Sequence, residues 1–182
     1  NGLIDILRRY KVGAFISSGK SGKAQSFEEL QKAIRDNKVP VIILGEGDKI
    51  KYGDNRFDIL SPSENLLQSA EPNDWGLVMK LEAGGAKALF TGDIDAKIEK
   101  SLVQKYDLDI DILKVSHHGS KFSSSDNFLR AITPKVALIG VGEKNTYGHP
   151  TLQALQRLLA AGAQIFRTDR DGTIKISAAV IL

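Results

Sequence analysis

The sequence predicts an α+β fold in which two packed β-sheets are flanked by helices. Before about residue 93, short apolar strands alternate with tight polar turns, a pattern typical of antiparallel hairpins. After that point, helical and strand patterns follow each other in turn, which is typical of strands joined by crossover helices. With 182 residues, 42% of them hydrophobic, the chain is long enough to form one domain with a sizeable core.

The first half combines two helical patterns with strands and hairpins. Ser26 is followed three residues later by Glu29, a capping-box signature that predicts the start of a helix at Ser26. The segment from Trp75 to Asp93 alternates, turns at the Gly-Gly pair and returns, which predicts a β-hairpin. The other expected elements are a helix ending near residue 10, strands over 12–17 and 39–47, and a strand pair joined by a turn over 53–55.

The second half alternates regularly between helices and strands. Helices are expected over about 95–106, 126–132 and 151–161, and strands over 109–116, 135–142 and 163–168. A turn at Asp171-Gly172 is expected to lead into a closing strand over 173–182.

Composition excludes several classes of site. Cysteine is absent, so a metal ion must be held by histidine and carboxylate side chains. No apolar run reaches the roughly 20 residues that a membrane-spanning helix needs. The net charge of +3 is only weak evidence for an anionic partner. Because the chain opens on Asn1 directly before a helical pattern, we expect it to be a piece of a longer polypeptide.

Metal-capable and proton-transferring side chains gather where predicted strands end. Asp93 follows the strand "ALFTG", His117 and His118 follow "DILKVS", and His149, the third and last histidine, lies in a loop after "VALIGVG". Strand ends are where open sheets usually build their sites, since the strand fixes the backbone and the loop frees the side chain. We therefore expect Asp93, His118 and His149 to converge at one edge of the sheet.

Each of these residues also has a purely structural interpretation. Asp93 or Asp95 could cap the following helix, and each histidine could be a hydrogen-bonded loop residue. The structural interpretations weaken when the residues are taken together, because all the histidines and a glycine-flanked aspartate occupy equivalent strand-end positions. A carboxylate with imidazoles and no thiol suits Zn, Mn or Fe.

The motifs "TGDID", "DILKVSHHGSKFSSS", "PKVALIGVG", "NTYGHP" and "FRTDRDGTIKI" occur in the order seen in metallo-β-lactamase-like domains. More narrowly, the sequence resembles the domain at the C-terminal end of ComEC-type DNA-internalisation proteins of bacterial competence. The resemblance covers nearly the whole chain and is strongest over 73–176. It implies an αββα sandwich, of which residues 1–182 would form the C-terminal portion as a single partial domain.

The resemblance also implies roles for the site residues. Asp93 would be a carboxylate that bridges two divalent ions, Mn or Zn, and His118 would be a ligand of the second ion. His117 would be a catalytic residue that supports His118, or an alternative ligand. His149 would be a catalytic residue near the scissile phosphate, where it stabilises charge or protonates the leaving oxygen.

The sequence departs from the family at one motif. The His-x-Asp-x-Asp-His segment, which supplies most metal ligands in these proteins, is absent from the 182 residues. In the family a Gly-Leu pair and a helix come directly after that motif, and here Gly2-Leu3 opens the chain. We therefore expect this chain alone to hold an incomplete metal site.

Three functions remain open on the sequence. The favoured one is a metal-dependent phosphodiesterase or nuclease that hydrolyses one strand of incoming DNA, as a soluble domain of a membrane-embedded parent protein. We expect it on the extracytoplasmic side, with the cytoplasm as the alternative and the oligomeric state undetermined. The alternatives are a non-catalytic module that guides DNA to the uptake channel, and a soluble metallo-hydrolase acting on a small phosphoester or lactone.

Two finer expectations concern nucleic-acid contacts and the histidine pair. Aromatic residues are only 7% of the chain and form no evident stacking series, which weakens the DNA-guiding alternative. Because Gly119 permits a backbone kink after His118 but not between the two histidines, one ligand and one supporting residue are expected. Loop cations could contact a nucleic-acid backbone, although each is more simply an ordinary surface charge: Lys20, Lys23, Lys121, Lys144 and Arg170.

Overall fold

A computed structural model describes residues 2–22 and 24–177. The helices are α1 (Gly2–Arg9), α2 (Gln25–Asp36), α3 (Ala96–Lys105), α4 (Asp126–Ile132), α5 (Leu152–Ala160) and α6 (Thr168–Asp171), with short 3-10 turns η1 (Leu66–Gln68), η2 (Pro72–Trp75) and η3 (Ser116–Gly119). The strands are β1 (Phe15–Ser17), β2 (Val41–Ile43), β3 (Lys49–Tyr52), β4 (Asn55–Ser61), β5 (Val78–Ala83), β6 (Ala86–Phe90), β7 (Ile112–Lys114), β8 (Val136–Ile139) and β9 (Gln164–Arg167).

A seven-stranded sheet runs through the molecule in the order β3-β4-β5-β6-β7-β8-β9. The strands from β3 to β6 pair antiparallel, and those from β6 to β9 pair parallel. This division confirms the α+β class and the change of pattern that the sequence predicts near residue 93. Because β6, β7 and β8 are parallel, the residues that follow them emerge at the same edge of the sheet.

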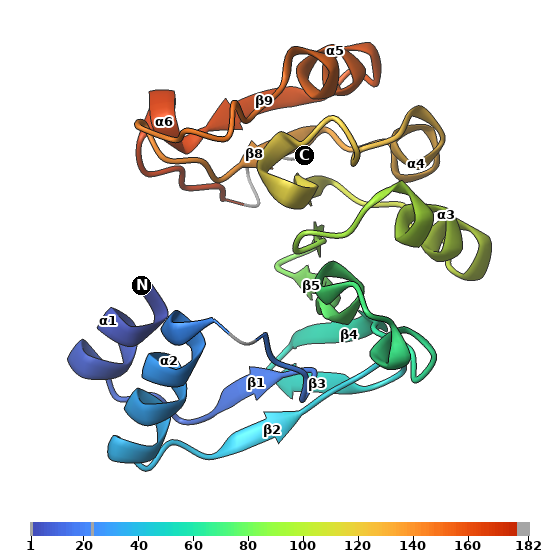
Figure 1. The fold of residues 1–182 in the computed structure, drawn as a ribbon. Helices are drawn as coiled ribbons and strands as arrows, with labels where there is room; N and C mark the ends of the chain where they lie inside the picture. The colour runs from blue at the N-terminus through green and yellow to red at the C-terminus, as the bar shows by residue number, and fades with distance from the viewer. Residues whose placement is uncertain (1, 23, 178–182) are drawn as a thin grey trace.

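Helices α3, α4 and α5 lie side by side along the parallel half of the sheet (Figure 1). Their apolar faces and the strands form the main core. Its fully buried side chains include Leu89 of β6, Leu113 of β7, Ile139 of β8, Phe128 of α4 and Leu158 of α5. Such a packed core gives the ends of β6, β7 and β8 a rigid base.

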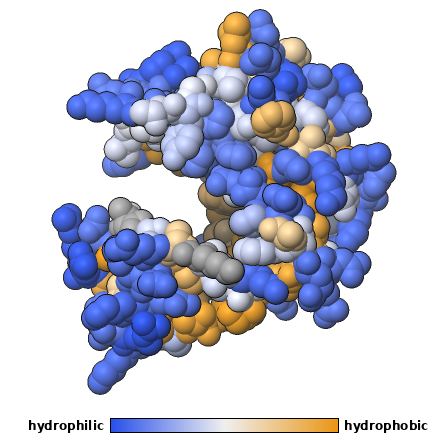
Figure 2. Space-filling model, in the orientation of Figure 1, coloured by the Kyte–Doolittle hydropathy of each residue, from blue (hydrophilic) through white to orange (hydrophobic). Residues whose placement is uncertain are grey.

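A second, smaller core lies under the N-terminal helices. Ile4 and Leu7, one turn apart on α1, pack against Ala33 and Ile34 of α2 and against Val39. Next to them β1 and β2 form a two-stranded parallel sheet. Figure 2 shows a hollow between these N-terminal helices, at the lower left, and the C-terminal elements at the top.

The surface of β2 is apolar and open. Val41, Ile42 and Ile43 are each about half exposed, at 50%, 45% and 56%. Figure 2 shows apolar side chains at the surface in this part of the molecule. Among the described helices, none is long and apolar enough to cross a membrane.

Several expected boundaries need correction. The capping box at Ser26 is wrong, because α2 begins one residue earlier and Ala24 occupies the N-cap position without a side-chain hydrogen bond. The strand expected over 109–116 is limited to β7, since the chain enters the turn η3 at Ser116. A short helix, α6, begins at Thr168, where the 163–168 strand was expected to end, and leads into the turn at Asp171-Gly172.

The expected closing strand over 173–182 is only partly open to inspection. Residues 173–177 form no strand, and residues 178–182 lie outside the described residues. Gly172 has a positive φ of +64°, as a turn requires, so the turn at Asp171-Gly172 is present although helix α6 leads into it.

Candidate active site

Asp93 is presented by a loop that is tied to the neighbouring strand. Buried Thr91 donates a hydrogen bond from its Oγ1 to the carbonyl oxygen of Lys114 at 2.7 Å, which joins the ends of β6 and β7. The N-cap of α3 is Asp95, whose carboxylate accepts hydrogen bonds from the backbone N–H groups of Lys97 and Ile98. Asp93 therefore takes no part in capping, and its half-exposed carboxylate is accessible to a metal ion or a substrate.

The two histidines lie in a strained turn. The φ angles of His117 and His118 are +48° and +53°, in the left-handed region that non-glycine residues seldom adopt. The backbone N–H of His117 donates to the carbonyl of Gly92 at 3.0 Å, so the turn is fixed to the loop of Asp93. The expectation that the chain kinks only after His118 is wrong, because the change of direction already begins at His117.

His118 is oriented by a backbone carbonyl. Its Nδ1 lies 2.5 Å from the carbonyl oxygen of Gly140, which can only accept, so Nδ1 carries a proton. In the neutral imidazole, Nε2 is then the nitrogen with the lone pair. That Nε2 lies 3.7 Å from Oδ1 of Asp93. A metal-binding histidine usually donates a hydrogen bond from one ring nitrogen to a carbonyl or carboxylate, and its other ring nitrogen binds the metal.

His149 lies on the other side of the histidine pair. Its ring meets that of His117 edge to face, with centroids 5.7 Å apart, and its Nδ1 is buried without a hydrogen-bond partner. Burial lowers the pKa of His149, and the neighbouring His117 and His118 lower it further, against the opposing effect of Asp93. The imidazole is therefore neutral at neutral pH, when it can accept one hydrogen bond and donate another.

The loops of the three histidines are locked together at Gly119. A Cβ at this position would lie 2.6 Å from Cβ of Pro150, and φ is +85°, so only glycine fits. The carbonyl of Gly119 also accepts hydrogen bonds from the N–H and the Oγ1 of Thr151, at 2.9 and 3.1 Å. The structure thus brings Asp93, His118 and His149 to one edge of the sheet, as the sequence predicts.

Lys114 is a site residue that sequence reasoning missed. It ends β7, its Nζ donates to the carbonyl of Val115 at 3.1 Å, and burial lowers its pKa although Asp93 acts in the opposite direction. A Cβ at Gly140 would lie 3.3 Å from Cε of Lys114, so this glycine leaves room for the lysine chain. A lysine inside the apolar strand "DILKVS" was the available signal.

A buried ionic group holds the serine-rich loop after the histidines. The carboxylate of Glu99, which is fully buried, accepts hydrogen bonds from the backbone N–H groups of Ser124 and Ser125. Arg157 donates to three carbonyls of the same loop, those of Lys121, Ser123 and Ser124. Sequence reasoning missed both residues, because α3 and α5 lie far from the loop in sequence.

The donor set fits a metal ion in kind but falls short in number. Asp93 and His118 offer a carboxylate oxygen and an imidazole nitrogen that face each other, and no thiol competes. Protein metal sites of this type use three or four protein ligands. Nowhere in residues 2–22 and 24–177 do three metal-capable side chains form a group, so the described residues supply at most part of a site.

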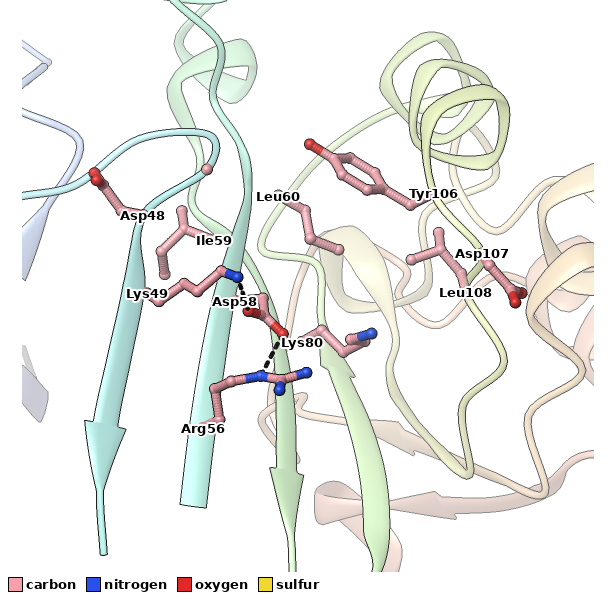
Figure 3. Close-up of a pocket in the computed structure, with 11 residues that line it drawn as sticks. Asp48, Lys49, Arg56, Asp58, Ile59, Leu60, Lys80, Tyr106, Asp107 and Leu108 are labelled. Atoms are coloured by element: carbon pink, nitrogen blue, oxygen red, sulfur yellow. Dashed lines mark hydrogen bonds and ion pairs between the residues drawn. The ribbon is translucent and has the colours of Figure 1, made fainter. Parts of the chain in front are cut away.

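Another cavity, of about 310 Å³, lies at the opposite part of the sheet among β3, β4, β5 and the residues after α3 (Figure 3). Several of its charged side chains form ion pairs. Asp58 accepts from Nε of Arg56 at 3.0 Å and lies 3.9 Å from Nζ of Lys49, and Lys80 pairs with Glu82 at 3.5 Å. None of the expected site residues lines this cavity.

The loop cations are dispersed. Lys121 lies over the ring of Phe122, with its Nζ 5.0 Å from the centroid, and Arg170 lies 4.0 Å from a carboxylate oxygen of Asp171. Lys23 lies outside the described residues. Lys20 and Lys144 are exposed on their loops. None of the contacts described above joins these cations into a continuous basic groove.

No protein-family model matches the chain. Among curated proteins, ComE operon protein 3 of Bacillus subtilis is 32% identical over 171 residues, which are 93% of this chain and 22% of that protein. Competence protein ComA of Neisseria gonorrhoeae is 41% identical over 121 residues, 65% of this chain and 17% of the relative. Recombination protein 2 of Haemophilus influenzae is 33% identical over 121 residues, 66% and 15%. The chain thus spans less than a quarter of the length of these relatives.

Solved structures share the fold at low sequence identity. A protein from Parabacteroides distasonis named as a metal-dependent hydrolase aligns with 90% of this chain and 79% of its own, at a TM-score of 0.54 and 11% identity. CmlA, a diiron β-hydroxylase from Streptomyces venezuelae, aligns with 89% of this chain and 39% of its own, at 0.54 and 10%. The sequence relatives and the shared fold together place this chain among the metallo-β-lactamase-like segments of ComEC-type competence proteins.

Proposed function

We propose that this chain is a partial domain of a metal-dependent phosphodiesterase that hydrolyses DNA within a competence protein. The observation that supports the proposal is the position of Asp93 Oδ1 3.7 Å from Nε2 of His118, two atoms that can both bind a metal ion. The names of two relatives, competence protein ComA and recombination protein 2, favour DNA as the substrate. The parent protein would be embedded in a membrane and hold this domain on its outer side.

In this proposal Asp93 and His118 supply two ligands, and the remaining ligands come from other parts of the natural polypeptide. A bound Mn²⁺ or Zn²⁺ pair would supply charge neutralisation and an activated water. Gly140 fixes the tautomer of His118, and His117 braces the ring of His149. His149, neutral at neutral pH, would hold or pass a proton at the phosphate oxygens.

A matched pair of aspartates two residues apart tests this proposal. In the natural polypeptide that contains this chain, Asp93→Asn should lower Mn²⁺-dependent hydrolysis of labelled DNA more than 100-fold, since it removes a charged ligand, or about 2.7 kcal/mol or more of transition-state stabilisation. Asp95→Asn should leave hydrolysis nearly unchanged, because asparagine caps helices as well as aspartate does. Thermal melting should show both variants folded.

The other outcomes separate the competing functions. Full activity of the Asp93→Asn protein would refute the proposed site. DNA binding without hydrolysis in the unmodified protein would favour the non-catalytic guiding module instead. Hydrolysis of a small phosphodiester or a lactone, without hydrolysis of DNA, would favour a soluble small-molecule hydrolase.

A further inference from the structure

A cavity of about 330 Å³ adjoins His118 and His149, and the proposed chemistry does not use it. Besides the two histidines, its walls are formed by Gly140, Val141, Gly142, Asn145 and Tyr147. Apart from the histidines and Asn145, these residues bring no charge and few polar groups. Its size lies at the lower end of the range of small-molecule sites, which suits one planar ring system rather than a folded partner.

Tyr147 is the most unusual wall residue. Its side chain is 84% exposed, although its ring lines the cavity. The ring is nearly parallel to that of His149, at 20° with centroids 6.5 Å apart. An exposed aromatic ring has no structural task in packing, but it offers a flat π-face beside the reacting groups.

The loop under Tyr147 is braced by a single side chain. Asn145 donates from Nδ2 to the carbonyls of Gly142, at 3.3 Å, and His149, at 2.9 Å. Its Oδ1 accepts from the backbone N–H of His149 at 3.2 Å. These bonds close the loop around Tyr147, so the ring is carried by an ordered frame and not by a free loop tip.

From these observations we propose that Tyr147 is a stacking platform for one unpaired nucleobase of the substrate, next to the bond that is cleaved. This inference rests on the proposed function and specifies its substrate class: a single strand, because a base within a duplex is already stacked on its neighbours. Stacking on an aromatic ring tolerates every base, since each has a π-face, so little sequence preference is expected.

The test measures binding in the presence of a chelator, which prevents turnover. The natural polypeptide that contains this chain is titrated with a single-stranded oligonucleotide and with an abasic strand of the same length, and fluorescence anisotropy is recorded. Tyr147→Ala should weaken binding of the base-containing strand by about 5- to 150-fold, the range for the loss of one stacked base. Binding of the abasic strand should not change.

Two controls keep the result specific. Tyr147→Phe keeps the ring but lacks the hydroxyl, and it should bind the base-containing strand normally. Normal binding would show that the ring, and not the hydroxyl, is what Tyr147→Ala removes. Tyr52→Ala removes an equally exposed tyrosine, 82% exposed, from β3 at the far end of the sheet, and should have no effect on either strand. Equal weakening of both strands by Tyr147→Ala, or no weakening at all, would overturn the inference.

The experiments distinguish a wrong role for Tyr147 from a wrong proposed function. Base-dependent binding through Tyr147 without any DNA hydrolysis would preserve the platform and refute the nuclease. Hydrolysis abolished by Asp93→Asn, together with a Tyr147→Ala protein that binds both strands normally, would preserve the nuclease and refute the platform.

Discussion

At the scale of single residues, the histidine pair shows how a backbone carbonyl assigns chemical roles. Gly140 holds the proton of His118 on Nδ1, so only Nε2 is left to face Asp93. His117 makes no such contact, and its ring lies edge-on to His149. Both residues have left-handed backbones, but only His118 is shown with a ring nitrogen beside the carboxylate. In the proposed site His118 is therefore the ligand and His117 the supporting residue, for a different reason than the sequence suggested.

This asymmetry predicts different consequences for the two histidines. Asparagine tolerates the left-handed backbone better than alanine does, so His118→Asn and His117→Asn keep the turn intact. In the natural polypeptide, His118→Asn should nearly abolish DNA hydrolysis and weaken Mn²⁺ binding. His117→Asn should lower either quantity by about 10- to 100-fold, as partners of a ligand do.

Turnover and calorimetric Mn²⁺ titration of both variants check this prediction. A His118→Asn protein with full activity beside an inactive His117→Asn protein would reverse the assignment. Full activity in both would remove the pair from the site.

Single residues also mark the limit of what the sequence could predict. The strand-end positions of Asp93 and His149 follow from apolar runs that stop abruptly, and such runs are legible in a sequence. The positive φ of His117 is not, because it depends on a hydrogen bond to Gly92, 25 positions earlier. Lys114 was missed because its importance comes from burial beside Asp93, which only tertiary packing creates.

At the scale of elements, α3 and α5 act as clamps on the loop that follows the histidines. Glu99 extends from α3 and Arg157 from α5, and between them they bind five backbone groups of one short segment, residues 121–125. A loop with several buried backbone groups needs such partners, since unpaired groups would each cost about 1–3 kcal/mol. The loop is thereby fixed to both helices.

This clamp predicts both a loss of stability and a change in its pH dependence for Glu99→Gln. The glutamine would direct its NH₂ group at a backbone N–H, two donors facing each other, at a cost of about 1–3 kcal/mol in the free energy of unfolding. Burial raises the pKa of Glu99, against the hydrogen bonds from Ser125 and Ser124, so the folded protein keeps this proton to higher pH than the unfolded chain does.

The sign of the pH effect follows from that difference. Above the unfolded pKa of about 4.3 the unfolded state binds fewer protons than the folded state, so stability falls as pH rises through the folded pKa. Glu99→Gln should remove this slope. Denaturant unfolding between pH 4 and 8 measures it, with Glu64→Gln, an exposed position, as a control that should shift stability by less than about 0.5 kcal/mol. An unchanged slope in the Glu99→Gln protein would contradict the prediction.

Elements with strong apolar periodicity were the most predictable. The hairpin of β5 and β6 and the alternation from α3 to β9 follow the sequence pattern closely. The capping-box prediction failed because a sequence motif does not show which residue is the N-cap. Ser26 lies inside the first turn of α2, and the N-cap Ala24 makes no side-chain hydrogen bond. Helix α6 was not expected, because its sequence is typical of a simple bend. Arg167 donates hydrogen bonds from its backbone N–H to Asp171 and from its guanidinium group to Asp169, and these bonds hold the segment in a helical turn.

At the scale of the whole molecule, the two sheets differ greatly in how well they are covered. The seven-stranded sheet carries α3, α4 and α5 and a large core, whereas β1 and β2 form a sheet of two strands. A two-stranded sheet is marginal without further strands or packing. The apolar side chains of β2 are about half exposed. Proteins usually protect an edge strand of this kind from pairing with other chains by placing charged residues on it.

This exposed strand predicts that the 182-residue chain by itself associates with other copies through β2. Exposed apolar strands with open edges pair readily with a second chain, and Val41, Ile42 and Ile43 carry no charge to prevent it. Val41→Lys combined with Ile42→Thr should shift the chain from oligomer toward monomer in size-exclusion chromatography with light scattering. Thermal stability should change little, because these side chains are only half buried.

A single leucine on another element provides the matched control for this prediction. Leu159 of α5 is 63% exposed but lies on a helix, where the backbone hydrogen bonds are already made and no strand can be added. Leu159→Lys should therefore leave the oligomer unchanged. If it dissociated the oligomer as well as the β2 variant does, the association would be general hydrophobic contact. If neither variant altered the distribution, or if the unmodified chain were monomeric at high concentration, the open face of β2 would not be a site of self-association.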